Sequence, residues 1–145
     1  MNVRSPVEDC AYAKLRRLTR CVAHHFDAEL APAGLRATQH GVLTEVLRLQ
    51  PVRPGKLAQA LGIDPSTLTR NLKPLLAARW LELGAGTDAR SRTVRITAIG
   101  RDKQAEAQLR LRVAQRAMNE KLGARRMADL RALMDESLEV LAMPP

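Results

Sequence analysis

A glycine-centred turn between two short amphipathic segments is the feature that most constrains this 145-residue chain. Residues 55–61 place their apolar side chains on one helical face, and Gly62 ends that helix. Asp64 and Pro65 then supply a capping residue and a first-turn proline for a second helix. The order of helix, glycine turn and helix predicts a helix-turn-helix.

The second helix of this pair has two distinct faces. Its leucines recur at helical spacing and are expected to point inward: Leu68, Leu72, Leu75 and Leu76. The remaining positions form a polar face made of Ser66, Thr67, Thr69, Arg70, Asn71 and Lys73. Pro74 lies inside the helix, where it removes one backbone donor and predicts a bend in the C-terminal half.

Two β-prone segments follow the helix pair. Residues 80–83 and 93–97 are predicted strands, and the glycine-rich, basic segment 84–92 is the turn between them. The turn presents Arg90 and Arg92 at its tip. A helix-turn-helix followed by such a hairpin is a winged helix, so the expected fold is mainly α with a small β-hairpin wing.

The charge is concentrated in the same part of the chain. The sequence has 24 Lys+Arg and 15 Asp+Glu, a formal net charge of +9. Residues 51–100 contribute +5, whereas residues 1–50 and 101–145 contribute +2 each. Charge beside a winged helix favours double-stranded DNA over an anionic membrane surface, and an aromatic content of 2% disfavours base stacking on single strands.

Individual roles at this interface follow from side-chain chemistry. A recognition helix contacts base edges from its N-terminal part, which favours Ser66, Thr67 and Arg70 as base readers. Asp88, two residues before Arg90, is expected to hold that guanidinium for a minor groove. Phosphate contacts are assigned to Lys56, Lys73 and Arg92, and Thr69 and Asn71 complete the predicted DNA-binding set.

Long helices are predicted on both sides of the winged helix. They cover about residues 6–31, 36–49, 101–121 and 124–142, the first with a capping box from Ser5 to Glu8 and the second with Gln39 beside Arg36, a poor cap. Residues 51–54 are compatible with a very short strand. The first and last helices carry apolar stripes that are too long for one small core, and a symmetric partner would cover them. We therefore expect a homodimer, with residues 1–35 and 101–145 as the dimerisation region and 36–100 as the DNA-binding region.

The sequence resembles the multiple-antibiotic-resistance regulator (MarR) family. The residues that carry the resemblance are Gly34-Leu35, Gln39, Leu57-Ala58, Leu61, the run Asp64-Pro65-Ser66-Thr67-Leu68-Thr69-Arg70, Asp88 with Arg90, Ile96-Thr97 and Gly100. The resemblance implies a homodimeric regulator, expected to be a repressor on a pseudo-palindromic operator, with a small ligand bound between the two regions. It covers about residues 8–142, and it departs from the family pattern at Arg36 and Pro74.

Three other sets of residues suggest ligand chemistry. Arg16, Arg17 and Arg20 are candidate partners for the carboxylate of an effector. Cys10 and Cys21 are candidate redox residues, although a rise of about 16 Å along one helix prevents a bond between them within a chain. Cys21 and His25 are spaced for a shared metal but lack two further ligands, so no metal and no cofactor is predicted.

Several protein classes receive no support from the sequence. No run of apolar residues is long enough to span a membrane, the N-terminus lacks a secretory signal, and a cytoplasmic location is expected. No catalytic motif or nucleophile–base pair is present, so the chain is not expected to be an enzyme. The alternatives left open are a redox- or metal-sensing variant of the regulator and a non-specific architectural DNA-binding protein.

Overall fold

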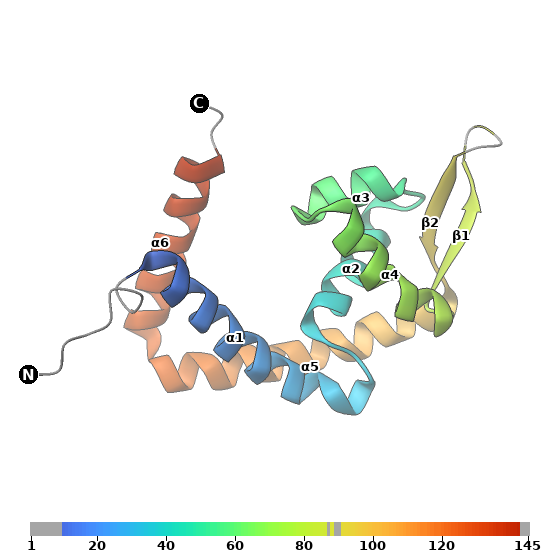
Figure 1. Ribbon diagram of the computed structural model, residues 1–145. Helices are drawn as coiled ribbons and strands as arrows, with labels where there is room; N and C mark the ends of the chain where they lie inside the picture. The colour runs from blue at the N-terminus through green and yellow to red at the C-terminus, as the bar shows by residue number, and fades with distance from the viewer. Residues whose placement is uncertain (1–9, 87, 89–90, 143–145) are drawn as a thin grey trace, which may run out of the picture.

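The computed structural model describes residues 10–86, 88 and 91–142, and it consists of helices with one two-stranded sheet (Figure 1). In Figure 1, α5 forms the base of the molecule, α1 and α6 lie at one end of it, and the helix-turn-helix and hairpin lie at the other. The elements are α1 (Ala11–Leu30), the 3-10 helix η1 (Ala31–Ala33), α2 (Ala37–Leu49), α3 (Pro54–Leu61), α4 (Pro65–Ala77), β1 (Leu81–Ala85), β2 (Arg92–Ile96), α5 (Ala98–Leu122) and α6 (Ala124–Ala142). The predicted mainly α fold with a β-hairpin is confirmed.

One hydrophobic core joins the winged helix to α5. It contains side chains from α2, α3, α4 and both strands, and α5 contributes Ala107. The side chains that are almost completely buried are Leu30, Leu43, Leu57, Leu68, Leu75, Leu81, Val42, Val46 and Val94. The leucines predicted to face inward on α4 therefore do so, except that Leu76 is only half-buried. Burial of each such side chain contributes about 1.5–3 kcal/mol, which fixes α4 against α2 and the hairpin.

The connection between α1 and α2 contains a left-handed glycine and a helix cap that the sequence did not predict. Gly34 adopts the left-handed conformation, with φ of 74°. The backbone N–H of Arg36 donates to Gln39 Oε1 over 2.9 Å, and the N–H of Ala37 donates to Asp27 Oδ1 over 2.8 Å. A carboxylate from α1 thus caps α2, which explains how α2 begins after an arginine. The capping box predicted at Ser5–Glu8 lies outside the described residues.

The helix-turn-helix has the predicted glycine turn. Gly62 has φ of 64° and follows α3, and Asp64 occupies the N-cap position of α4. Asp64 was predicted to cap this helix, but its side chain makes no capping hydrogen bond. Helix α4 is continuous through Pro74, which deprives the Arg70 carbonyl of its usual helical donor. The bend predicted at Pro74 stays a prediction.

Helix α4 ends in a tight turn that leads directly into the hairpin. Arg79 has φ of 58°, in the left-handed region that favours glycine. The N–H of Arg79 donates to the Leu76 carbonyl over 3.1 Å, and the N–H of Trp80 donates to the Leu75 carbonyl over 3.0 Å. These two bonds define a Schellman motif, which sets the direction of β1 relative to α4.

The hairpin is antiparallel and is anchored on its outer side. Leu81 pairs with Ile96 and Ala85 pairs with Arg92. Val52 and Val94 exchange backbone hydrogen bonds of 3.2 and 2.8 Å, so the short strand predicted in residues 51–54 forms as a single bridge. The wing is therefore attached to the turn between α2 and α3 as well as to α4.

The start of α5 differs from the prediction. The sequence predicted a helix from residue 101, after Gly100, but the helix begins at Ala98 with Thr97 as its N-cap. Gly100 is buried inside the first turn, where it does not break the helix. The prediction was wrong because glycine was interpreted as a boundary, whereas this glycine is required by close packing.

The apolar stripes of the first and last helices are only partly covered within the chain. Phe26 and Leu30 of α1 and Met127 of α6 are buried. The apolar side chains nearer the chain ends are exposed: Tyr12, Leu15 and Leu18 on α1, and Leu133, Met134, Leu138, Val140 and Leu141 on α6. Large exposed apolar surfaces of this kind mark association sites.

A buried histidine lies between α2 and α5. His40 is 7% exposed, and its Nε2 lies 3.3 Å from Thr44 Oγ1. Gln104 of α5 donates to the same hydroxyl over 3.2 Å. Burial lowers the pKa of His40 below the ordinary histidine value, and a hydrogen bond with Gln108 opposes this effect more weakly. The neutral imidazole is therefore the stable form in the folded chain.

This lowered pKa predicts that the protein becomes less stable in mild acid. As the pH falls below about 6.5, the unfolded chain takes up a proton at His40 before the folded chain does. The free energy of unfolding should therefore be highest above that pH and decrease from pH 7 to pH 5 in urea titrations. His40→Gln should reduce this slope, whereas His24→Gln, at an exposed histidine of α1, should retain it. An unchanged slope in the His40 variant contradicts the assignment.

Candidate nucleic-acid interface

The polar face of α4 is the centre of the candidate interface. Ser66, Thr69, Arg70 and Lys73 are exposed, while Thr67 and Asn71 are half-buried. The opposite face of α4 packs into the core through the buried Leu68, Leu72 and Leu75. All six polar residues therefore lie away from the buried leucine face, as helical periodicity predicted. Thr67 and Asn71 lie nearer to that face than the other four.

Local hydrogen bonds restrict two of these side chains. Thr69 Oγ1 donates to the Pro65 carbonyl over 3.0 Å, so part of its hydrogen-bonding capacity is used by the helix. Arg70 Nη2 lies 3.5 Å from Thr67 Oγ1, one turn earlier. Arg70 therefore has a neighbour that orients it, and its other guanidinium N–H groups remain suited to the two acceptors of a guanine edge.

The tip of the wing is organised by a short polar turn. Asp88 Oδ1 accepts the backbone N–H of Ser91 over 2.7 Å, and the Gly86 N–H donates to the Ser91 carbonyl over 2.7 Å. A Cβ at Gly86 would lie 2.8 Å from the Ser91 carbonyl oxygen, so a larger residue would require the backbone of the turn to shift. Arg90, the predicted minor-groove residue, lies outside the described residues. Asp88 has a structural role in the turn that the sequence did not reveal.

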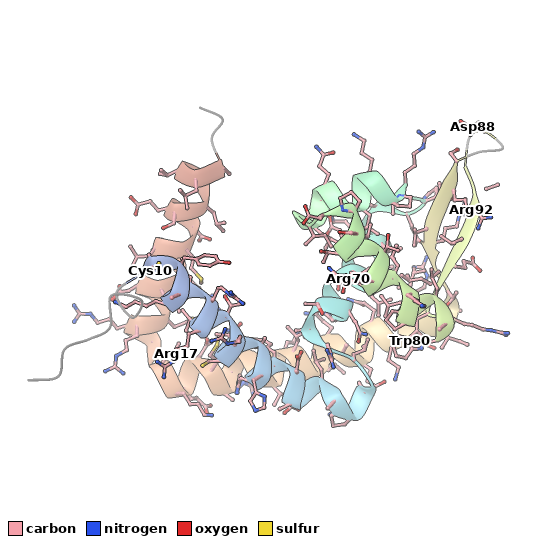
Figure 2. All side chains as sticks on the ribbon, in the orientation of Figure 1. Cys10, Arg17, Arg70, Trp80, Asp88 and Arg92 are labelled. Carbon is pink, nitrogen blue, oxygen red and sulfur yellow. The ribbon has the colours of Figure 1, made fainter. Side chains whose placement is uncertain are left out.

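Arg92 lies at the start of β2 and is exposed, as expected for a phosphate contact. Figure 2 shows Arg92 and Asp88 on the hairpin and Arg70 on α4, all at the same end of the molecule. Lys56, the other predicted phosphate contact, is exposed on α3. The structure therefore brings the predicted residues of three elements together at one end.

A compact joint fixes the wing relative to α4. Thr97 Oγ1 donates to the carbonyls of Arg79 and Trp80, at 2.7 and 3.1 Å, and accepts the N–H of Gly100 over 3.0 Å. A Cβ at Gly100 would lie 1.9 Å from the Trp80 carbonyl oxygen. The end of α4, the start of β1 and the start of α5 therefore meet at distances that only glycine permits.

Of the two cysteines, Cys10 lies far from this interface (Figure 2). Cys10 and Cys21 are exposed free thiols, and Figure 2 shows Cys10 on α1 at the opposite end from Arg70. The prediction that they do not bond to each other is consistent with this arrangement. Redox sensing stays a prediction.

His25, which the sequence paired with Cys21 as a weak candidate for a metal site, makes other contacts. His25 Nε2 lies 2.8 Å from the Ala114 carbonyl oxygen of α5, and its ring packs edge-on against Phe26. Within residues 10–86, 88 and 91–142, no group of three or more His, Cys, Asp or Glu side chains could hold a metal. His25 therefore connects α1 to α5.

The candidate effector residues Arg16, Arg17 and Arg20 are all exposed on α1. The Arg16 guanidinium carbon lies 5.7 Å from the centre of the Tyr12 ring. The hollow at the junction of α5 and α6 is lined by Arg116 and Arg131 instead. None of the three candidates lines this hollow.

Comparison with known proteins finds a family similarity in the central part of the chain. Residues 33–91, which include the helix-turn-helix and the first strand of the wing, match the family model described as MarR family. Over this segment the chain is similar to the MarR family. No match was found among curated proteins. Among the described residues, no helix is long and apolar enough to cross a membrane.

Solved MarR-family structures share the fold over most of the chain. The M. tuberculosis transcriptional regulator MosR in complex with DNA is 28% identical, with a TM-score of 0.74, over 93% of this chain and 100% of that chain. A mutant MarR from E. coli complexed with operator DNA is 24% identical, with a TM-score of 0.76, over 86% and 90%. The transcriptional repressor CouR on a 23-mer DNA duplex is 22% identical, with a TM-score of 0.78, over 94% and 95%. These descriptions are of regulators, not of enzymes.

Proposed function

We propose that this protein is a sequence-specific, homodimeric DNA-binding transcription regulator that represses its targets until a small ligand releases it. The observation that carries the proposal is the exposed polar face of α4 beside a β-hairpin wing that carries Arg92. This arrangement suits a helix in the major groove and a hairpin in the adjacent minor groove. The DNA complexes of MosR, MarR and CouR support the same use of the fold.

In this proposal the chain has two functional regions. Residues 36–100 bind double-stranded DNA, and residues 1–35 and 101–145 form the dimer, because most of the large exposed apolar side chains are on α1, α5 and α6. A two-fold dimer would present two copies of α4 to half-sites about one helical turn apart. The protein would act in the cytoplasm, and an effector with a carboxylate would use Arg16, Arg17 or Arg20.

Binding to the DNA upstream of its own gene tests the proposal. Fluorescence anisotropy at physiological salt should give tight binding to one segment and at least about 1,000-fold weaker binding to unrelated duplexes. The second candidate is a non-specific architectural protein, for which the high net charge is the supporting observation. Equal affinity for all duplexes would favour this candidate and overturn sequence-specific regulation.

Arg70 should contribute most of the base discrimination from α4. Arg70→Ala should lower the affinity for the operator by about 5- to 150-fold per half-site, because one bidentate guanine contact contributes about 1–3 kcal/mol. Binding to unrelated duplexes should change much less. The matched control is Lys73→Ala, which should weaken binding to all sequences to a similar extent. The assignment of Arg70 fails if its variant behaves like the Lys73 variant.

A further inference from the structure

Three basic side chains surround a hollow at the turn between α2 and α3. Arg48, Arg53 and Lys56 line this hollow of about 480 Å³, and none of the described residues that line it is acidic. All three side chains are exposed. We refer to Arg48, Arg53 and Lys56 as the corner cluster. Arg48 and Arg53 were not among the residues predicted from the sequence.

Arg48 is held in place by a neighbouring carboxylate. Its Nε donates to Glu45 Oε1 over 3.1 Å, and its Nη2 contacts the same oxygen. Arg48 lowers the pKa of the Glu45 carboxyl through this hydrogen bond, and Glu45 raises the pKa of Arg48. Both groups are therefore charged near neutral pH, and the remaining Arg48 N–H groups face solvent.

The corner cluster lies between the two elements that the proposed function assigns to DNA. On one side, the Val52–Val94 bridge joins the turn to β2, and Gln50 Oε1 accepts the Ile96 N–H over 3.1 Å. On the other side, α3 packs against α4. Figure 1 shows α3 beside both α4 and the hairpin. The cluster is thus attached to the wing and to the recognition helix at once.

We propose that the corner cluster binds the DNA phosphate backbone that separates the major groove on α4 from the minor groove on the wing. This inference rests on the proposed function, because it assumes that both elements contact one duplex. A sugar-phosphate strand must cross between two adjacent grooves, and three basic side chains, one of them paired with Glu45, suit its negative charge. The Val52–Val94 bridge then fixes the position of the phosphate contact relative to the wing.

The salt dependence of DNA binding tests this proposal. Each phosphate contact contributes about 0.9 to the slope of log K against log salt concentration. Arg53→Gln removes two such contacts from a dimer, so the slope should fall by about 2 and the affinity at 0.15 M salt by about 30-fold. The loss should be the same for operator and unrelated duplexes, because phosphates carry no sequence information. Arg48→Gln should have the same effect.

The matched control is Arg126→Gln, an equal change of charge at an exposed position on α6, at the other end of α5. It should leave the slope within about 0.3 of the wild-type value. If wild-type protein binds its operator but Arg53→Gln and Arg48→Gln behave like this control, the corner proposal is wrong and the proposed function stands. If wild-type protein binds no duplex, both are overturned. Thermal unfolding of each variant confirms that it is folded before binding is measured.

Discussion

Replacing Gly100 with alanine should destabilise the protein by at least about 3 kcal/mol, a large part of the 5–15 kcal/mol typical of a domain. The added Cβ would lie 1.9 Å from the carbonyl oxygen and 2.8 Å from the carbonyl carbon of Trp80, and 2.9 Å from Ile96 Cγ1. Two of these three atoms belong to the backbone, so no change of rotamer relieves the contact. The backbone of α5 must instead move away from the α4–β1 junction.

That movement would break a specific set of hydrogen bonds. Thr97 connects the Arg79 and Trp80 carbonyls to the N–H of Gly100 through a single hydroxyl. Separation of α5 from this turn would remove these bonds and alter the position of the wing relative to α4. Any fraction of Gly100→Ala that still folds should therefore bind DNA more weakly than its concentration of folded protein predicts.

The control for this experiment is provided by another helical glycine. Gly41 lies inside α2, and a Cβ added there meets no heavy atom within 4 Å. Gly41→Ala should be neutral or stabilise the protein by about 0.5–1 kcal/mol, because alanine is favoured over glycine within helices. Urea denaturation of both variants gives the comparison. Equal stabilities for the two alanine variants would show that the Trp80 contact does not restrict Gly100.

Local signals in the sequence were sufficient to predict the helix-turn-helix and the wing. Gly62, with Asp64 and Pro65 after it, determines where α3 ends and α4 begins, and each signal acts within a few residues. The polar face of α4 followed from helical periodicity alone. Helix boundaries and helix faces could be predicted from the sequence because the residues that determine them are neighbours in the chain.

Features that depend on tertiary contacts were not predicted. Gly100 is required by Trp80, twenty positions earlier, and the cap on α2 comes from Asp27 on a different helix. The corner cluster combines residues on both sides of the α2–α3 turn, and this turn is joined to the wing by the Val52–Val94 bridge and the Gln50–Ile96 hydrogen bond. Spacing in the sequence contains no signal for contacts of this kind.

Removing the exposed apolar face of α6 should convert the proposed dimer into a monomer. Met134, Leu138 and Leu141 lie at helical spacing on one face of α6 and are 43%, 66% and 82% exposed. In a two-fold dimer, replacing all three with glutamine changes six side chains. Because burial of one such side chain contributes about 1.5–3 kcal/mol, the loss is on the order of 10 kcal/mol. Glutamine is accommodated in helices and adds no charge, so the folding of each protomer and its electrostatic attraction to DNA should be retained.

Loss of the dimer should have a large effect on DNA affinity. Two linked recognition helices bind a pseudo-palindrome more tightly than one by a factor of about 10² to 10⁴, because the second half-site is engaged within the same complex. Light scattering should give the mass of a single chain, and anisotropy should show an operator affinity reduced by at least about 100-fold. Leu83→Gln, which replaces an exposed leucine of β1, is the matched control and should remain dimeric. A triple variant that keeps the dimer mass would place the interface elsewhere, whereas a monomer with unchanged operator affinity would mean that one winged helix is enough for recognition.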